Sequence, residues 1–196
     1  QAPHVSAFSF SPLPVLTMDR PKELQFFHWG LIPAWCANEE KAEEMRSMTL
    51  NAKSESIFER ASFRQPILKK RCLVFTDGFY EWREFNKKKY PYFIRLKQQD
   101  SFCMAGIFDQ WLNKSTGELI NGCSIVTTAA NALMEQIHNT KKRMPVILTK
   151  DKMDHWIAPE QNKTELEQLM APIDSSLLLA HPISKLITSR TQNPNV

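Results

Sequence analysis

Between residues 71 and 127, short segments of strand-forming composition follow one another at regular spacing, and turn signals separate them. The turn signals are Asp77-Gly78, a polar stretch at 86–89 and Lys-Ser-Thr-Gly at 114–117. The segments that we expect to be strands are Cys72–Phe75, Phe79–Trp82, Tyr90–Leu96, Phe102–Trp111 and Ile120–Thr127. Short strands at this spacing are typical of a sheet that curls towards a barrel. The sequence therefore predicts an α+β protein with a barrel-like, mixed or antiparallel β core.

Short helices and a few further strands are expected around this core. An irregular lead-in at 1–14 precedes a strand pair, Val15–Thr17 and Leu24–Trp29, joined by a turn at 19–21. Helical patterns are found at Glu39–Met48, at Ser54–Phe58 with Ser54 as the cap, at Ser62–Leu68, at Ala129–Ile137, at Lys150–Trp156 and at Thr164–Leu169. After a turn at Arg143–Pro145, strands are expected at Val146–Leu148 and Leu177–His181. A length of 196 residues with 42% hydrophobic composition suits one compact domain over 1–196.

The charge distribution permits a polyanionic partner. The net charge is +4, and three short basic clusters adjoin predicted elements: Lys69–Arg71, Lys87–Lys89 and Lys141–Arg143. A solvated surface explains any one of them, whereas three beside aromatic-rich segments also fit a nucleic-acid-binding face. No apolar run approaches the length of a membrane span, so a membrane partner is not expected.

The four cysteines are widely spaced and lie mostly in apolar runs: Cys36, Cys72, Cys103 and Cys123. This pattern predicts buried free thiols rather than a disulfide framework. The chain contains neither Cys-x-x-Cys nor His-Glu-x-x-His, and we expect no metal site and no cofactor.

Glu81 is the first candidate for chemistry. In a strand that follows Asp77-Gly78, it shares one face with Phe79, among several aromatic residues. Such surroundings desolvate a carboxyl group and raise its pKa towards the range of a general acid or base. The alternative is an edge-strand glutamate that solvates the sheet. His138, at the predicted end of a helix, is either a second acid–base group or a capping residue.

Two further residues have a functional and a structural interpretation. Trp35 follows a kink at Pro33 and could offer a stacking platform to a base or sugar, whereas Trp29 fits the core. Asn51 lies just ahead of a predicted helix, where its amide could bind a substrate or simply form a turn.

Six motifs occur in a fixed order along the chain. They are Trp-Gly-Leu-Ile-Pro-x-Trp at 29–35, Asn-Ala-Lys-x-Glu at 51–55, Arg-Cys-Leu-Val with Asp-Gly-Phe-Tyr-Glu-Trp at 71–82, Ile-His at 137–138, Arg-Met-Pro at 143–145 and His-Pro-Ile-Ser at 181–184. Together they resemble the SOS response-associated peptidase (SRAP) family over nearly the whole chain. The resemblance implies a compact α+β fold with a β-barrel-like core.

It also implies a sensor of abasic sites in single-stranded DNA that bonds covalently to the damaged sugar through an N-terminal cysteine. By motif, the implied catalytic residues are Asn51, Glu81 and His138, and the implied DNA-binding residues are Trp35, Lys53, Trp82 and Arg143, with Arg60 and Arg64 as weaker phosphate positions. Lys53 replaces the more usual arginine. The spacing from His138 to Arg143 is longer than in the commonest pattern, which leaves the position of Arg143 open.

The covalent chemistry needs an α-amine beside a thiol, because the amine forms a Schiff base and the thiol then closes a thiazolidine ring. The sequence opens on Gln1, and we expect a segment with the nucleophilic cysteine to precede it. Two alternatives remain: a thiol-type peptidase that removes its own N-terminal residues, and a non-catalytic module that binds single-stranded DNA. We expect a monomer, cytoplasmic and nucleoid-associated in a bacterium or nuclear in a eukaryote.

Overall fold

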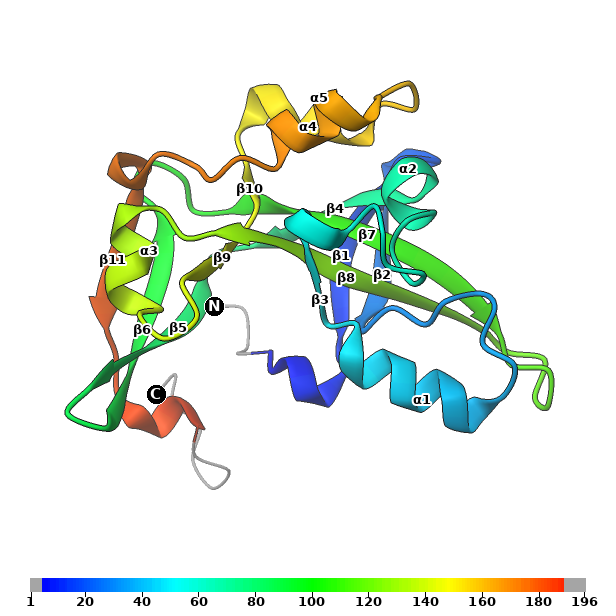
Figure 1. The fold of residues 1–196 in the computed structure, drawn as a ribbon, viewed down its shortest axis with the longest axis horizontal. Coiled ribbons are helices and arrows are strands. Elements are labelled where there is room, and N and C mark those ends of the chain that lie inside the picture. The colour runs from blue at the N-terminus through cyan, green and yellow to red at the C-terminus, as the bar shows by residue number, and fades with distance from the viewer. Residues whose placement is uncertain (1–4, 189–196) are drawn as a thin grey trace.

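The computed structural model describes residues 5–188, and most of its strands form one curled sheet (Figure 1). The strands run in the order β10-β7-β4-β1-β2-β8-β3, with β9 paired to β8. Their bounds are β1 Pro12–Thr17, β2 Arg20–Trp29, β3 Asn51–Lys53, β4 Arg71–Thr76, β7 Phe102–Leu112, β8 Leu119–Ala129, β9 Arg143–Pro145 and β10 Ile147–Leu148. An additional pairing of β7 with β8 closes five of these strands into a barrel, so the predicted α+β, barrel-like core is confirmed.

The barrel closes where β7 changes partners. Its first half pairs with β4 and its second half pairs with β8, and the two pairings overlap at Gly106 and Ile107. A Cβ atom at Gly106 would lie 2.7 Å from the sulfur of Cys72 and 2.8 Å from a methyl of Val74. Only glycine therefore allows the three strands to cross so closely.

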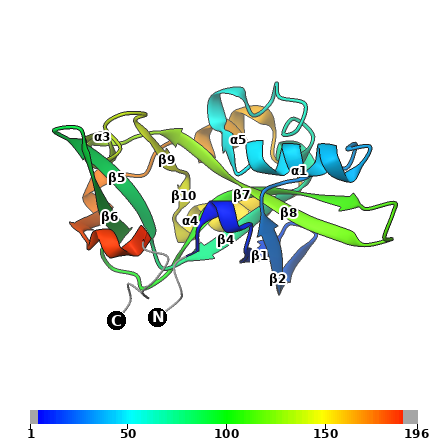
Figure 2. The same ribbon diagram turned by 90° about the horizontal axis from the view of Figure 1, so that it is seen from below.

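A second, three-stranded sheet has the order β11-β6-β5, from Leu178–Pro182, Lys88–Leu96 and Phe79–Phe85. We had expected these strands in one sheet with the barrel. The chain instead turns away after β4 at Gly78, where a Cβ atom would lie 2.3 Å from the Phe93 ring. Figure 2 shows the small sheet at one end of the molecule, beside α3. A two-residue turn with positive φ at Asn86 and Lys87 joins β5 to β6.

The helices α4 (Lys150–Ile157) and α5 (Lys163–Leu169) cover one side of the barrel, and α1 (Glu39–Met48) lies on the other (Figure 1). Trp156 of α4 is fully buried, and its indole N–H donates to the carbonyls of Cys72 in β4 and Gly106 in β7. A further short helix, α2, is a single turn at Pro66–Lys69. α1, α4 and α5 begin and end within a residue of the predicted bounds.

Three local predictions were wrong. Ser54 does not cap a helix: it opens a 3-10 turn, Ser54–Ser56, and Asn51 lies in β3 rather than in a loop. The helix expected from Ala129 begins at Ala132, because β8 continues through Ala129 and Asn131 caps the helix by accepting from Met134 N. The segment Arg143–Pro145, expected to be a turn, is the strand β9, since it pairs with β8.

One member of the first basic cluster belongs to the core. Arg71 is fully buried. It donates to four backbone carbonyls, those of Ile67, Leu68, Trp156 and Ala158. A guanidinium has five N–H donors, so these carbonyls offset much of the cost of burying it. The cluster at 69–71 therefore offers less positive charge to a polyanion than the sequence indicated.

All four cysteines are buried and free, as expected. Burial raises the pKa of the Cys103 and Cys123 thiols to about 12, and the pKa values of Cys36 and Cys72 are also raised. These thiols are therefore poor nucleophiles. Within residues 5–188, no helix combines the length and the apolar character that crossing a membrane would require.

Candidate active site

Glu81 and His138 lie in contact where the end of α3 meets strand β5. Glu81 is the third residue of β5, and His138 is the residue on which α3 (Ala132–Ile137) ends. Nδ1 of His138 lies 3.3 Å from Oε2 of Glu81, and their side chains are only 17% and 23% exposed. The structure thus pairs two residues that are 57 positions apart in sequence and that the motifs predicted to share one site.

The surroundings of Glu81 favour a proton-transfer role. Burial raises the pKa of its carboxyl group, while the nearby His138 and a hydrogen bond from the Trp82 amide lower it in part. The Trp82 N–H donates to Oε1 of Glu81 over 3.2 Å, and Oε2 is the oxygen that lies close to His138. A held carboxyl group with a raised pKa suits general acid–base chemistry.

The tautomer of His138 follows from its neighbours. Nδ1 lies 2.9 Å from the carbonyl oxygen of Arg143 as well as close to the Glu81 carboxylate. The carbonyl oxygen can only accept a hydrogen bond, so Nδ1 carries a proton and donates it to this oxygen. Nε2 is then the ring nitrogen that can exchange a proton with a substrate.

Arg143 lies beside this pair, because its backbone carbonyl contacts the His138 ring. Its guanidinium donates to the hydroxyl and the carbonyl of Thr127, and its Nη1 donates to Oε1 of Glu55 over 2.8 Å. Despite the longer spacing, the carbonyl of Arg143 contacts the His138 ring. Arg143 keeps the pKa of Glu55 below its usual range.

Strand β8 organises the rest of the site. β3 pairs with one edge of β8 at residues 125–127, and β9 pairs with its other edge at 127–129. Lys53 on β3 is opposite Thr127, the residue to which Arg143 donates. Asn51 and Lys53 are both exposed, on either side of the buried Ala52. Three of the predicted residues, Asn51, Lys53 and Arg143, therefore border the same end of β8.

Two of the three basic clusters also reach the site. Lys89, near the β5–β6 turn, and Lys141, in the loop after α3, are both close enough to lower the pKa of Glu81. Lys87, Lys88 and Lys142 are exposed beside them. The first cluster contributes little, because Lys70 forms a salt bridge with Asp109. Lysines from two of the three clusters thus lie near the Glu81–His138 pair.

The two tryptophans predicted to bind DNA lie apart. Trp82 is partly buried in β5, directly after Glu81. Trp35 is 53% exposed in the loop between β2 and α1, where Ala34 N donates to Asp109 and Cys36 packs beside Ile120. Residues 120 and 128 of β8 are separated by about 27 Å at the usual rise of a strand. The loop between β2 and α1, which holds Trp35, therefore lies at the opposite end of the barrel from β5, which holds Glu81 (Figure 1).

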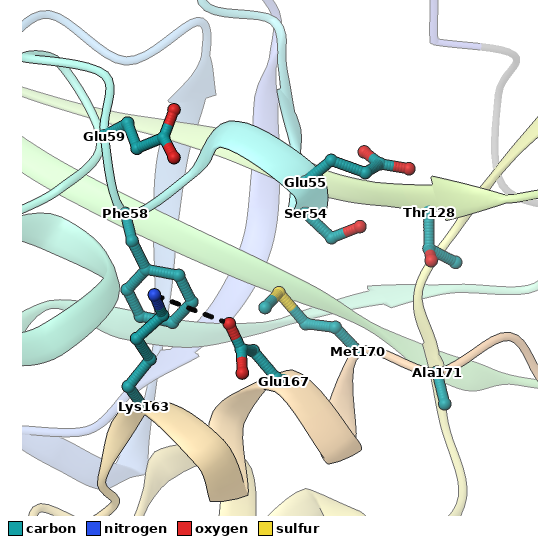
Figure 3. Close-up of a pocket in the computed structure, with 9 residues that line it drawn as sticks. All are labelled: Ser54, Glu55, Phe58, Glu59, Thr128, Lys163, Glu167, Met170 and Ala171. Atoms are coloured by element: carbon teal, nitrogen blue, oxygen red, sulfur yellow. Dashed lines mark ion pairs between the residues drawn. The ribbon is translucent and has the colours of Figure 1, made fainter.

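A pocket of about 250 Å³ adjoins the site beyond β3, between the Ser54–Ser56 turn and α5 (Figure 3). Its walls include three carboxylates, Glu55, Glu59 and Glu167, and one ammonium group. That group, from Lys163, pairs with Glu167 and lies over the Phe58 ring. The acidic lining disfavours a phosphate backbone. Glu55 connects the pocket to the site, because it also binds Arg143.

Three residues of this site were not predicted from the sequence: Glu55, Thr127 and Asn139. Glu55 belongs to a recognised motif, but nothing in the motif shows that it binds Arg143. Thr127 looks like any residue of a strand. Asn139 forms two hydrogen bonds with the backbone of Glu84, which a local pattern cannot reveal.

Comparisons with known proteins agree with the motifs. A family model described as SOS response associated peptidase (SRAP) matches residues 2–190. The abasic site processing protein YoqW of Bacillus subtilis (strain 168) is 38% identical over 167 residues, which are 84% of this chain and 71% of that protein. The abasic site processing protein HMCES of Xenopus tropicalis is 32% identical over 190 residues, covering 87% of this chain and 55% of its own length.

A solved structure supports the same relationship. A crystal structure of a protein from Bacteroides thetaiotaomicron superposes with a TM-score of 0.93 at 45% sequence identity, and the match covers 98% of this chain and 82% of that one. Since the family model matches most of the sequence and relatives share more than 30% identity over most of it, the chain belongs to the SRAP family.

Proposed function

We propose that this protein recognises abasic sites in single-stranded DNA and captures them as a thiazolidine on an N-terminal cysteine. The observation that carries the proposal is the Glu81–His138 pair, a desolvated carboxyl group 3.3 Å from an imidazole within a basic surface. The names of the relatives, abasic site processing proteins, support this substrate.

Ring opening of the abasic sugar is the first step. The sugar is mainly a closed hemiacetal, and its conversion to the reactive aldehyde needs one proton removed from the hydroxyl and one delivered to the ring oxygen. Because Nδ1 of His138 is held by the Arg143 carbonyl, Nε2 is available to transfer the proton. Asn51, exposed on β3, would orient the sugar with its amide.

Capture of the aldehyde follows. The α-amine adds to the carbonyl carbon, and loss of one water gives an imine. The cysteine sulfur then bonds to the imine carbon as its thiol proton passes to nitrogen, so the product is the sum of both reactants less one water. Glu81, as carboxylate, accepts the proton that the ammonium must lose before attack.

The nucleophile is not one of the four internal cysteines. They lack an α-amine, and burial raises the pKa of each thiol. A cysteine at the mature N-terminus has both groups.

The DNA backbone would follow the basic end of β8. Arg143 and Lys53 border Thr127 and would bind phosphates, and the lysines of the β5–β6 turn and of the loop after α3 add positive charge on the other side of Glu81. Trp82 would stack on a base next to the lesion.

The test is an incubation of the protein, with its complete N-terminus, with a single-stranded oligonucleotide carrying one abasic site. We expect an adduct that survives denaturing electrophoresis and that Glu81→Gln or His138→Gln slows at least tenfold. Glu84→Gln, an exposed glutamate on the same strand, is the matched control and should have no effect.

Two results would favour other functions. Reversible binding of the oligonucleotide without any adduct would favour a non-catalytic DNA-binding module. Cleavage of unrelated peptides, abolished by substitution of the N-terminal cysteine, would favour the peptidase of the family name.

A further inference from the structure

The segment between His138 and Arg143 forms a turn that returns the chain to the site. Lys142 N donates to the carbonyl of His138 over 2.8 Å, and Lys142 adopts a positive φ of 49°. The Lys142 carbonyl then accepts from Ala130 N, which starts the pairing of β9 with β8. The four intervening residues are thereby accommodated, and one of them, Asn139, contacts β5.

Asn139 binds the backbone of Glu84 at two points. Its Oδ1 accepts from Glu84 N over 3.0 Å, and its Nδ2 donates to Glu84 O over 2.8 Å. β5 is the edge strand of the small sheet, so this N–H and C=O face away from β6. The side-chain amide thus pairs with the strand edge as the peptide group of a neighbouring strand would.

The same edge of β5 also holds Glu81. Residues 82 and 84 direct their N–H groups to this edge, because alternate residues of an antiparallel strand do so. The N–H of Trp82 donates to the Glu81 carboxylate, and that of Glu84 donates to Asn139. The loop after α3 therefore meets β5 at two adjacent points, where His138 meets Glu81 and Asn139 meets Glu84.

We propose that Asn139 is a positioning residue for the reaction, which docks the loop on the edge of β5 and so holds the His138 ring against Glu81. This inference rests on the proposed function. Without the amide, the loop keeps its turn but loses its attachment to β5. The His138–Glu81 contact then opens more often, and fewer molecules have the proton-transfer pair assembled.

The consequences for rate and pH dependence follow directly. Two neutral hydrogen bonds together are worth about 1–2 kcal/mol, so Asn139→Ala should slow cross-linking about five- to thirtyfold. His138 lowers the pKa of Glu81, and its withdrawal should raise that pKa. Glu81 acts as a base, so the acid limb of the rate profile should move to higher pH.

The experiment compares Asn139→Ala with Thr140→Ala, an exposed neighbour in the same loop. Cross-linking rates are measured against pH at saturating DNA, together with the Kd for single-stranded DNA without a lesion. We expect the slower rate and the shifted acid limb only in Asn139→Ala, with an unchanged Kd. A rate and a profile like those of the wild type would overturn the inference, and so would a loss confined to DNA affinity.

A double-mutant cycle tests whether Asn139 acts through His138. In a His138→Gln background, Asn139→Ala should have almost no further effect on the rate, whereas an additive loss would show an independent role. If the wild-type protein forms no adduct, the proposed function fails. The positioning role is then judged by a carbon-13 titration of the Glu81 carboxyl group, whose midpoint should rise in Asn139→Ala and whose constancy would refute the role.

Discussion

Glu55 accepts a 2.8 Å hydrogen bond from Nη1 of Arg143, the guanidinium that we propose binds DNA phosphate. Nε and Nη2 of the same guanidinium donate to Thr127. Thr127 therefore fixes the orientation of the guanidinium, while the half-exposed Glu55 carboxylate occupies the position of an anionic partner. Without DNA, Arg143 already has an anion, and a phosphate must displace it.

Glu55→Gln should therefore strengthen the binding of single-stranded DNA. The amide still accepts from Arg143 but has no charge to compete with phosphate, so we expect the Kd at low salt to fall severalfold. The measurement is fluorescence anisotropy with a labelled oligonucleotide over a range of salt concentrations. Glu59→Gln, which removes an exposed carboxylate from the same pocket, is the control for general charge. Weaker binding in Glu55→Gln would instead mean that Glu55 holds Arg143 in its binding orientation.

The separation of the two tryptophans predicts a dependence on DNA length. Trp82→Ala should weaken the binding of short and long oligonucleotides alike, because Trp82 adjoins Glu81. Trp35→Ala should weaken only the binding of oligonucleotides long enough to reach the far end of the barrel, by about 1–3 kcal/mol for the loss of one stacked base. Both variants are titrated with abasic oligonucleotides of increasing length. An equal loss at every length would contradict the placement of Trp35.

Replacing the buried carboxyl group of Glu81 should stabilise the protein at neutral pH. Burial raises the pKa of Glu81 in the folded state above its ordinary value. The contribution of this group to the free energy of unfolding is therefore fully present at low pH and is lost as the pH rises through the folded pKa. Glu81→Gln lacks this cost, and we expect its Tm to exceed that of the wild type by a few degrees at pH 7.5 but not at pH 4. Thermal unfolding of Glu84→Gln provides the baseline. A lower Tm for Glu81→Gln at pH 7.5 would show that the contact with His138 outweighs the desolvation.

Much of the fold could be predicted from local patterns. The strands between 71 and 127 and the helices α1, α4 and α5 have clear periodicity and turn signals, and the structure confirms them. Features that depend on distant partners could not be predicted in this way. β9 is a strand only because β8 lies beside it, and the guanidinium of Arg71 can be buried because α2 and the end of α4 supply carbonyl groups to it.

The candidate site also has a part that the sequence could predict and a part that it could not. Glu81 and His138 could be named from motifs, since each lies at a recognisable place at a strand or helix end. The position of the small sheet, which leaves the barrel at Gly78, determines three further features. They are the distance between Glu81 and His138, the proton on Nδ1 and the hydrogen bonds of Asn139 to β5. Periodicity describes single elements, whereas this geometry arises from the packing of several.

The most direct measurement is the mass and the location of the covalent adduct. The protein with its complete N-terminus is incubated with an abasic oligonucleotide, and intact and proteolysed products are analysed by mass spectrometry. The account predicts a mass equal to protein plus DNA less one water, on a peptide that begins with the N-terminal cysteine. An adduct on Cys36, Cys72, Cys103 or Cys123, or no adduct at all while the oligonucleotide still binds, would contradict it.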